Sequence, residues 1–313
     1  MKKSAKIYIA GHKGLLGSAI EEKLRSEGYH NLVLRTHKEL DLTRQEKVEM
    51  FFEKEKPEYV FIAAAKAGGI GANMSRPAEF IYDNLMIEAN IINSSYKYGV
   101  KKLIFVSSAS IYANNETNAI REEELLKGTL EKSNEAYAIA KISGIKLCEF
   151  YRKQYGCDFI SAVPINLYGK RDNFSLENGH VLPMLIRKFH EAKKENKSEV
   201  IIWGTGKALR EFMYAEDLAD ALIYLMKNYS ENIHINVGTG EEISIQDLAL
   251  LIKNIVGFNG EIKNDLSKSD GAPRKLINIE KLSSLGWKSK ISLEEGIKKT
   301  YEWYLENENR LRY

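Results

Sequence analysis

Tyr137 and Lys141 stand four residues apart in the stretch SNEAYAIAKISGIKLCE, residues 133–149, and these two side chains are suited to acid–base chemistry. The stretch is rich in Ala, Ile, Lys and Glu, which favours a helix. Residues i and i+4 of a helix lie on the same face, so the phenol and the ammonium are expected to be neighbours. An ammonium stabilises a phenolate and lowers the pKa of the phenol from its ordinary value of about 10. The pair fits a proton donor to a carbonyl oxygen, although two solvated helix residues would show the same spacing.

A glycine-rich turn near the N-terminus indicates a nucleotide site. The β-rich run Lys6–Ala10 leads into GHKGLLG, residues 11–17, and a helix-like stretch follows to about Glu27. Strand, glycine turn and helix together are the context of a dinucleotide-binding loop, because glycines let the backbone approach a pyrophosphate that faces the helix N-terminus. The spacing is GxxGxxG rather than GxGxxG, so its position after the first strand carries the prediction.

The end of the second predicted strand, Asn31–Leu34, bears on which dinucleotide is bound. NAD-binding proteins usually carry an acid at this point, whereas an arginine suits the 2′-phosphate of NADP. This chain has Arg35 there, and Lys13 and His37 could add positive charge. The sequence therefore favours NADP(H), with a merely solvated Arg35 and Lys13 as the alternative.

The first half of the chain alternates between strand and helix patterns. Further strands are predicted at Tyr59–Ala63, Lys102–Val106 and Phe159–Val163, with helices at Gln45–Lys54 and Phe80–Tyr98. This alternation predicts an α/β fold with a Rossmann, doubly wound parallel sheet, whose ligands bind at the carboxyl ends of the strands. Ser108, which directly follows one of these strands, is expected to meet Tyr137 and Lys141 at that edge.

The pattern changes after residue 168, and the second half carries no second glycine fingerprint. We predict an NADP(H)-binding domain over residues 1–168 and a smaller α/β substrate domain over 169–313, with roughly 212–237 returning to the first domain. The elements predicted in this half are helices at Val181–Ala192, Asp217–Lys227, Ile245–Val256 and Leu293–Glu306 and strands at Val200–Trp203 and Ile233–Val237.

Composition excludes several classes of partner. The chain has 313 residues and a net charge of only +3, which gives no reason to expect nucleic acid. Cys148 and Cys157 show neither metal-ligand nor disulfide spacing, so we predict no metal site and a reducing, cytoplasmic location. No stretch approaches the roughly 20 apolar residues of a membrane span, and the N-terminus lacks the apolar region of a signal peptide.

Several long stretches resemble the GDP-L-fucose synthase family of extended short-chain dehydrogenase/reductases, over nearly the whole chain. They are AAAKAGG, FIYDNLMIEANII, YAIAKISGIKLCE, NLYGKRDNF, HVLP, REFMYAEDLA, HINVGTG and DGAPRKL. The resemblance implies NADP(H) in an N-terminal Rossmann domain and a GDP-4-keto-6-deoxy sugar as substrate. The family epimerises C3 and C5 of this sugar and then reduces its C4 ketone. It is commonly dimeric through helices such as Phe80–Tyr98 and Tyr137–Tyr155, so a homodimer is also implied.

The resemblance also implies roles for individual residues. Ser108, Tyr137 and Lys141 match the reductive triad, and His180 matches the acid of epimerisation. The implied cofactor positions are Gly11, Lys13, Gly14, Leu15, Leu16, Gly17, Arg35, His37, Asp41, Leu42, Ala63, Ala65, Val106, Ser107, Lys141, Pro164, Asn166 and Leu167. The implied substrate positions are Ser110, Asn166, His180, Lys188, Trp203, Arg210 and Asp270.

The chain departs from the family pattern at four of these positions. Lys13, His37 and Lys188 stand where the family usually has arginine, and Ser110 stands where it has the epimerase cysteine. We therefore predict a C4 reductase of a GDP-4-keto-6-deoxy hexose or heptose, in nucleotide-sugar biosynthesis for surface polysaccharide, with epimerase activity weakened or absent. A full GDP-L-fucose synthase that tolerates serine is the alternative. A non-catalytic NADP(H)-sensing regulator is a more distant one, because it would not need the complete triad. No motif distinguishes a hexose from a heptose.

Overall fold

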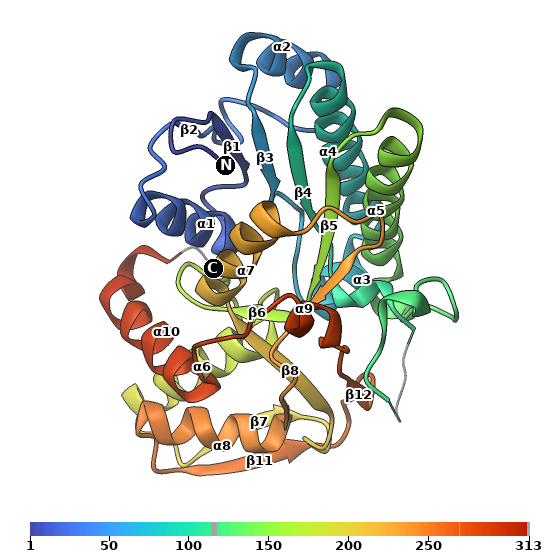
Figure 1. Ribbon diagram of the computed structural model, residues 1–313. Coiled ribbons are helices and arrows are strands. Elements are labelled where there is room, and N and C mark those ends of the chain that lie inside the picture. The colour runs from blue at the N-terminus through green and yellow to red at the C-terminus, as the bar shows by residue number, and fades with distance from the viewer. Residues whose placement is uncertain (114–117, 269, 312–313) are drawn as a thin grey trace.

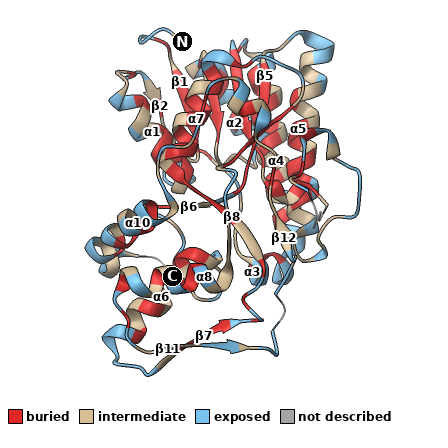
Figure 2. Ribbon diagram, turned by 60° about the horizontal axis from the view of Figure 1, so that its bottom comes forward, coloured by how far each residue is buried: buried red, intermediate tan, exposed pale blue. Residues whose placement is uncertain are grey.

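The computed structural model describes residues 1–113, 118–268 and 270–311. Figure 1 shows a central sheet between helices in its upper part and a smaller group of strands and helices below. Burial follows the same division, since Figure 2 shows buried residues concentrated on the strands of the central sheet and on the sides of the helices that face it.

The central sheet has six strands, all parallel. In sheet order they are β2 (Leu32–Val33), β1 (Ile7–Ala10), β3 (Tyr59–Ile62), β4 (Lys102–Val106), β5 (Phe159–Pro164) and β9 (Ile235–Val237). Every residue of β1, β4 and β5 is buried, as expected for strands covered on both faces. The Rossmann-type α/β fold that the sequence predicts is confirmed.

Helices cover both faces of this sheet (Figure 1). On one side α1 (Leu15–Ser26) packs against α7 (Ala215–Asn228), and on the other α4 (Pro77–Lys97) packs against α2 (Gln45–Glu55) and α5 (Glu135–Tyr155). Local chemistry sets some of their ends. Pro77 occupies the first turn of α4, where no intrahelical N–H is needed. Gly156 caps the end of α5 directly after Tyr155, and its φ of +69° is left-handed.

The lower part of the molecule is built around β8 (Leu209–Tyr214). This strand pairs with β6 (Asn166–Tyr168), β10 (Glu242–Ser244) and β12 (Arg274–Lys275), and a separate pair joins β7 (Glu199–Trp203) to β11 (Glu261–Asp265). A second apolar core lies between these strands and the helices α6 (Val181–Lys194), α8 (Ile245–Val256) and α10 (Leu293–Asn307). The remaining short elements are α3 (Ile70–Ser75), α9 (Glu280–Ser284) and the 3₁₀ turns η1 (Ala109–Ile111), η2 (Glu122–Glu124), η3 (Lys132–Asn134) and η4 (Glu308–Arg310).

Part of the second half of the chain belongs spatially to the central sheet. The strand β9 pairs with β5, with Ala162 beside Ile235 and Pro164 beside Val237, and α7 packs on α1. The domain boundary at residue 168 stays a prediction. In the part of the chain that the structure describes, no helix combines the length and apolarity needed to cross a bilayer.

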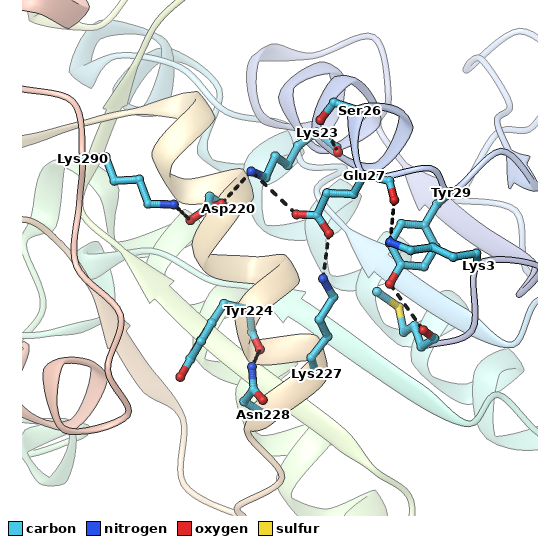
Figure 3. A network of polar contacts seen from close by, with 11 residues as sticks. Lys3, Lys23, Ser26, Glu27, Tyr29, Asp220, Tyr224, Lys227, Asn228 and Lys290 are labelled. Atoms are coloured by element: carbon cyan, nitrogen blue, oxygen red, sulfur yellow. Dashed lines mark hydrogen bonds and ion pairs between the residues drawn. The ribbon is translucent and has the colours of Figure 1, made fainter.

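A network of charged side chains fixes α7 in place (Figure 3). Asp220 on α7 pairs with Lys23 of α1 and with Lys290, each at 2.8 Å, and accepts a hydrogen bond from Trp287. About two turns further along α7, Lys227 pairs with Glu27 at 2.7 Å. Since α1 follows the glycine loop, this network holds α7 against the helix that begins at that loop.

Candidate functional site

The glycine turn closes tightly and has no room for larger side chains at two positions. Gly11 has a φ of +85°, and a Cβ there would lie 2.8 Å from the backbone of Ala64. A Cβ on Gly17 would lie 2.1 Å from the carbonyl oxygen of Gly11. Gly14 precedes α1 without a side-chain cap, which leaves the N–H groups of the first turn available to an anion. The turn therefore fits the diphosphate of a dinucleotide.

The end of β2 carries the residues expected at the adenosine side of the cofactor. Arg35 forms an ion pair with Glu55 at 2.6 Å and stays partly exposed, while Lys13 and His37 are exposed. Glu39 lies near these cations. Hydrogen bonds from the Thr36 N–H and hydroxyl lower the pKa of its carboxyl, and the charges of Arg35 and Lys13 add to this. A 2′-phosphate would thus meet Arg35 and Lys13 in competition with two carboxylates.

Other candidate cofactor residues lie at the carboxyl ends of neighbouring strands. Ala63 and Ala65 follow β3, Val106 ends β4 with Ser107 directly after it, and Pro164 ends β5. Because β3, β4 and β5 are adjacent and parallel, these residues share one edge of the sheet.

Hydrogen bonds fix several candidates near that edge. Ser107 donates to the Lys141 carbonyl at 3.3 Å, and Asn166, which precedes Leu167 on β6, donates to the Glu211 carbonyl at 2.9 Å. Asp41 accepts from Thr43, and the Leu42 carbonyl accepts from Asn90 at 2.9 Å. Leu15 and Leu16 begin α1, with Leu16 buried.

The structure brings Ser108, Tyr137 and Lys141 together. Ser108 stands between β4 and η1, and Tyr137 and Lys141 occupy successive turns of α5. The Lys141 Nζ lies 5.7 Å from the centre of the Tyr137 ring and donates to the Val106 carbonyl at 3.2 Å. Lys141 is buried, with 1% of its surface exposed. A phenol, a hydroxyl and a buried ammonium thus converge where a dinucleotide-binding sheet holds its reactive ligand.

The electrostatics at Tyr137 differ from the simple expectation. Lys141 does lower the pKa of Tyr137, as does a hydrogen bond with Ser108. Burial has the larger effect, however, and together with the charge of Glu88 it raises the pKa of Tyr137 above its ordinary value. For Lys141, burial lowers the pKa, but Glu88 and Tyr137 outweigh it and the net shift is upward. In this structure Tyr137 is a phenol and Lys141 an ammonium.

Ser110 lies within hydrogen-bonding distance of the triad. Its hydroxyl donates to the Ser108 Oγ at 3.1 Å, and its N–H points to the same oxygen at 3.3 Å. His180 precedes α6, and its carbonyl accepts from Met184. The His180 ring is open to solvent, yet the protein around it lowers its pKa by desolvation, so the ring is neutral at pH 7.

The substrate candidates of the lower part lie around β7 and β8. Trp203 ends β7 with 55% of its surface exposed, and Lys188 on α6 donates to the Ile201 carbonyl of the same strand at 3.2 Å. Asp270 accepts from the N–H and the hydroxyl of Thr205, each at 2.7 Å. Asp270 therefore holds the turn that follows Trp203.

Arg210 has a cationic neighbour to which the sequence assigned no role. In the pairing of β8 with β12, Arg210 stands beside Lys275, whose Nζ donates to the Tyr112 carbonyl at 2.9 Å. Burial lowers the pKa of both groups, and burial together with the charge of Arg210 brings that of Lys275 to about 8. Lys275 belongs to the stretch DGAPRKL, but only the strand pairing shows that it adjoins Arg210.

Comparisons with known proteins agree with this geometry. Residues 7–238 match the NAD dependent epimerase/dehydratase family. The "Putative GDP-L-fucose synthase 2" of Arabidopsis thaliana is 57% identical over 98% of this chain and 94% of its own. Two solved structures from Campylobacter jejuni are similar. A GDP-6-OMe-4-keto-L-xylo-heptose reductase has a TM-score of 0.93 and 43% identity over 98% of this chain and 99% of its own. A GDP-mannoheptose C4 reductase with NADP bound has a TM-score of 0.90 and 47% identity over 97% of this chain and 99% of its own.

Proposed function

We propose a function from the premise that this chain belongs to the NAD dependent epimerase/dehydratase family and, within it, to the GDP-L-fucose synthase family. The chain reduces the C4 ketone of a GDP-4-keto-6-deoxy sugar with little or no epimerisation at C3 and C5. It is an NADP(H)-dependent oxidoreductase of the extended short-chain dehydrogenase/reductase type that acts on a GDP-sugar. The observation that carries the finer proposal is a complete Ser108, Tyr137 and Lys141 triad beside a serine at position 110.

The triad supplies the groups that reduction needs from the protein. Bound NADPH supplies the hydride that is added to C4. The Tyr137 phenol donates its proton to the oxygen as negative charge develops there, and the Ser108 hydroxyl hydrogen-bonds to the same oxygen. Lys141 stabilises the phenolate that remains on Tyr137 after the transfer.

Epimerisation makes a different demand, which Ser110 meets poorly. A carbon-bound proton beside the ketone must be removed and another returned on the opposite face. A cysteine, with an ordinary pKa of about 8.5, provides thiolate near neutrality, whereas a serine hydroxyl needs an adjacent base. Here the Ser110 hydroxyl donates to the hydroxyl of Ser108, which is not a base. Neutral His180 could accept a proton, but it would then be lost as the acid on the other face.

The lower part of the molecule offers groups suited to the nucleotide. Arg210 and Lys275 stand side by side, and an adjacent guanidinium and ammonium suit a diphosphate. The exposed Trp203 ring offers a flat surface on which a base or sugar can stack. We assign the diphosphate to Arg210 and Lys275, with Lys188 and Trp203 on the nucleotide side.

Assembly and location are part of the proposal. A homodimer through α4 and α5 is supported by large side chains more than half exposed on these helices, Tyr82 at 58% and Phe150 at 54%. A cytoplasmic location is supported by two free cysteines, Cys148 and Cys157.

The test is solvent deuterium incorporation at C3 and C5 of GDP-4-keto-6-deoxy-mannose, with NADP⁺ in place of NADPH so that reduction cannot trap the substrate. We expect negligible exchange by the wild type together with rapid NADPH oxidation in the reductive assay. Ser110→Cys should gain exchange, and Ser110→Ala, the matched control, should not. Rapid wild-type exchange at both carbons would contradict the proposal and support a full GDP-L-fucose synthase.

A further inference from the structure

Glu88 is a buried acid beside the reductive triad, with 1% of its surface exposed. It lies on α4, and its Oε1 is 2.9 Å from the Lys141 Nζ on α5. The side chains of Glu88 and Lys141 are 1% and 2% exposed, so both charges of this pair are shielded from water. Its sequence context, FIYDNLMIEANII, carries no pattern that indicates acid–base chemistry.

The helix opposite Glu88 is shaped to admit its carboxylate. Gly144 lies on α5, three residues after Lys141, and a Cβ at Gly144 would come within 2.7 Å of the Glu88 Oε2. The same Cβ would lie 2.3 Å from the Phe105 ring. The absence of a side chain at Gly144 therefore lets α4 and α5 approach closely enough for the ion pair to form.

This pair changes what Lys141 does to Tyr137. An isolated ammonium would stabilise the phenolate strongly, but an ammonium with a carboxylate at 2.9 Å is a neutral pair with a much weaker field. The charge of Glu88 acts on Tyr137 in the direction opposite to that of Lys141. Burial raises the pKa of the Glu88 carboxyl and Lys141 offsets this only in part, while Glu88 raises the pKa of Lys141, so Glu88 keeps Lys141 in its ammonium form.

We propose that Glu88 is a positioning residue of the reductive site: its carboxylate holds the Lys141 ammonium and offsets its charge, so that Tyr137 retains its proton and is poised to donate it. The inference rests on the roles of Tyr137 and Lys141 in the proposed function and adds a reason for the direction of the reaction. Reduction needs a protonated tyrosine, whereas oxidation of the alcohol would need the phenolate.

The titratable groups whose charges interact with Glu88 lie on α5, one of the two long helices packed against α4. They are Tyr137, Lys141 and Cys148 of α5, while β4 contributes the Phe105 ring and the Val106 carbonyl. Burial raises the pKa of the Cys148 thiol to about 12, so Cys148 stays mostly neutral up to pH 11. Ser108 does not titrate. A change in the pH profile on altering Glu88 is therefore assignable to Tyr137 and Lys141.

The experiment is the pH profile of kcat/KM for reduction of GDP-4-keto-6-deoxy-mannose by NADPH, from pH 6 to 11. The alkaline limb of the wild type reports loss of the Tyr137 proton. Glu88→Gln, which keeps the shape and removes the charge, should move this limb to lower pH by about one unit, because it leaves the ammonium unopposed beside the phenol. At pH values on the limb the variant is then roughly tenfold slower than the wild type. On the acid side the two rates should agree within a few-fold, as should the affinity for NADPH.

Two further variants make the outcome decisive. Glu88→Asp, which withdraws the charge by one methylene, should shift the limb in the same direction but less, and it carries the test if the glutamine variant does not fold. Glu149→Gln on α5 is the control. It breaks a 2.7 Å ion pair between Glu149 and Lys146 that does not involve the triad, and it should leave the limb unmoved. If the limb stays in place or moves to higher pH in the Glu88 variants while Tyr137→Phe has lost turnover, the inference about Glu88 is overturned and the proposed function is not. A Tyr137→Phe enzyme that keeps both turnover and the limb would overturn the proposed function with it.

Discussion

Asp220→Asn is expected to loosen the attachment of α7 to the rest of the molecule. Asp220 pairs with Lys23 of α1 and with Lys290 (Figure 3), and it accepts a hydrogen bond from Trp287. Burial by itself would raise the pKa of Asp220, but these partners outweigh it and lower the pKa from 3.8 to about 2. The carboxylate is 16% exposed, so solvent screens its interactions only in part.

The size of the effect follows from the pKa shift. A shift of almost two pH units is worth about 2.4 kcal/mol at about 1.36 kcal/mol per unit, and partial screening by solvent reduces this to about 2 kcal/mol of stabilisation. The pKa is depressed in the folded state, so this stabilisation is fully present well above pH 4 and is lost as the pH falls through the folded value. At pH 3, about midway between the folded and unfolded pKa values, roughly half of it remains.

The measurement is urea unfolding of wild type and Asp220→Asn, followed by circular dichroism at pH 7 and at the lowest pH where the wild type is folded. The variant should lose about 2 kcal/mol at pH 7, with the difference shrinking on acidification. Glu294→Gln, which breaks an exposed pair with Lys298, is the control and should cost less than about 0.5 kcal/mol. A loss for Asp220→Asn no larger than that of the control, or one independent of pH, would refute the reasoning.

Two further predictions concern catalysis and cofactor choice. Tyr137→Phe should fold and bind NADPH but lose ~10²–10⁴-fold in kcat, because it removes the proton donor while keeping the ring; turnover within a few-fold of wild type would show that another group is the acid. Arg35→Asp should lower kcat/KM for NADPH by about 10- to 100-fold, the cost of losing a hydrogen bond to a charged group, and shift preference towards NADH. Equal kcat/KM values for the two cofactors in the wild type would remove the basis for assigning Arg35 to the 2′-phosphate.

The strands and helices of the central sheet could be predicted from the sequence because their patterns are strong. The predicted strand Lys102–Val106 matches β4, and the predicted helix Gln45–Lys54 matches α2 (Gln45–Glu55) to within one residue. Buried parallel strands are continuous apolar runs, and amphipathic helices repeat with a period of 3.6 residues. The predicted helix at Phe80–Tyr98 begins three residues earlier, at Pro77, since proline also suits a first helical turn.

Other elements could not be predicted because their patterns are short or polar. The strand β11 has the sequence EIKND, with no buried residue, and β12 has only two residues. Both exist because a neighbouring strand offers its backbone, which is a tertiary fact rather than a local one. The strand β8 was not predicted either, because the charged Arg210 and Glu211 interrupt the apolar pattern expected of a strand in the middle of a sheet.

The candidate site shows the same division. Motif spacing sufficed to predict that Tyr137 and Lys141 share a helix face and that Ser108 lies at the same edge of the sheet. Glu88 and Lys275 were not predicted, because each lies beside a partner that is distant in sequence. Glu88 pairs with Lys141, and Lys275 stands beside Arg210. The expected fall in the pKa of Tyr137 did not appear, because burial and Glu88, neither visible in a YxxxK pattern, outweigh the lysine.

The serine at position 110 fits reduction as well as it disfavours epimerisation. A hydroxyl carries one proton and can accept two hydrogen bonds. The Ser108 oxygen is approached by the N–H and the hydroxyl of Ser110, so its acceptor sites are occupied from the side of η1. The proton of Ser108 is then free to point to Tyr137 or to the ketone oxygen. A thiol at position 110 would be a weaker donor to Ser108, because S–H forms weak hydrogen bonds. Under the proposed function, a serine at position 110 supplies no thiolate for epimerisation and at the same time orients the Ser108 hydroxyl for C4 reduction.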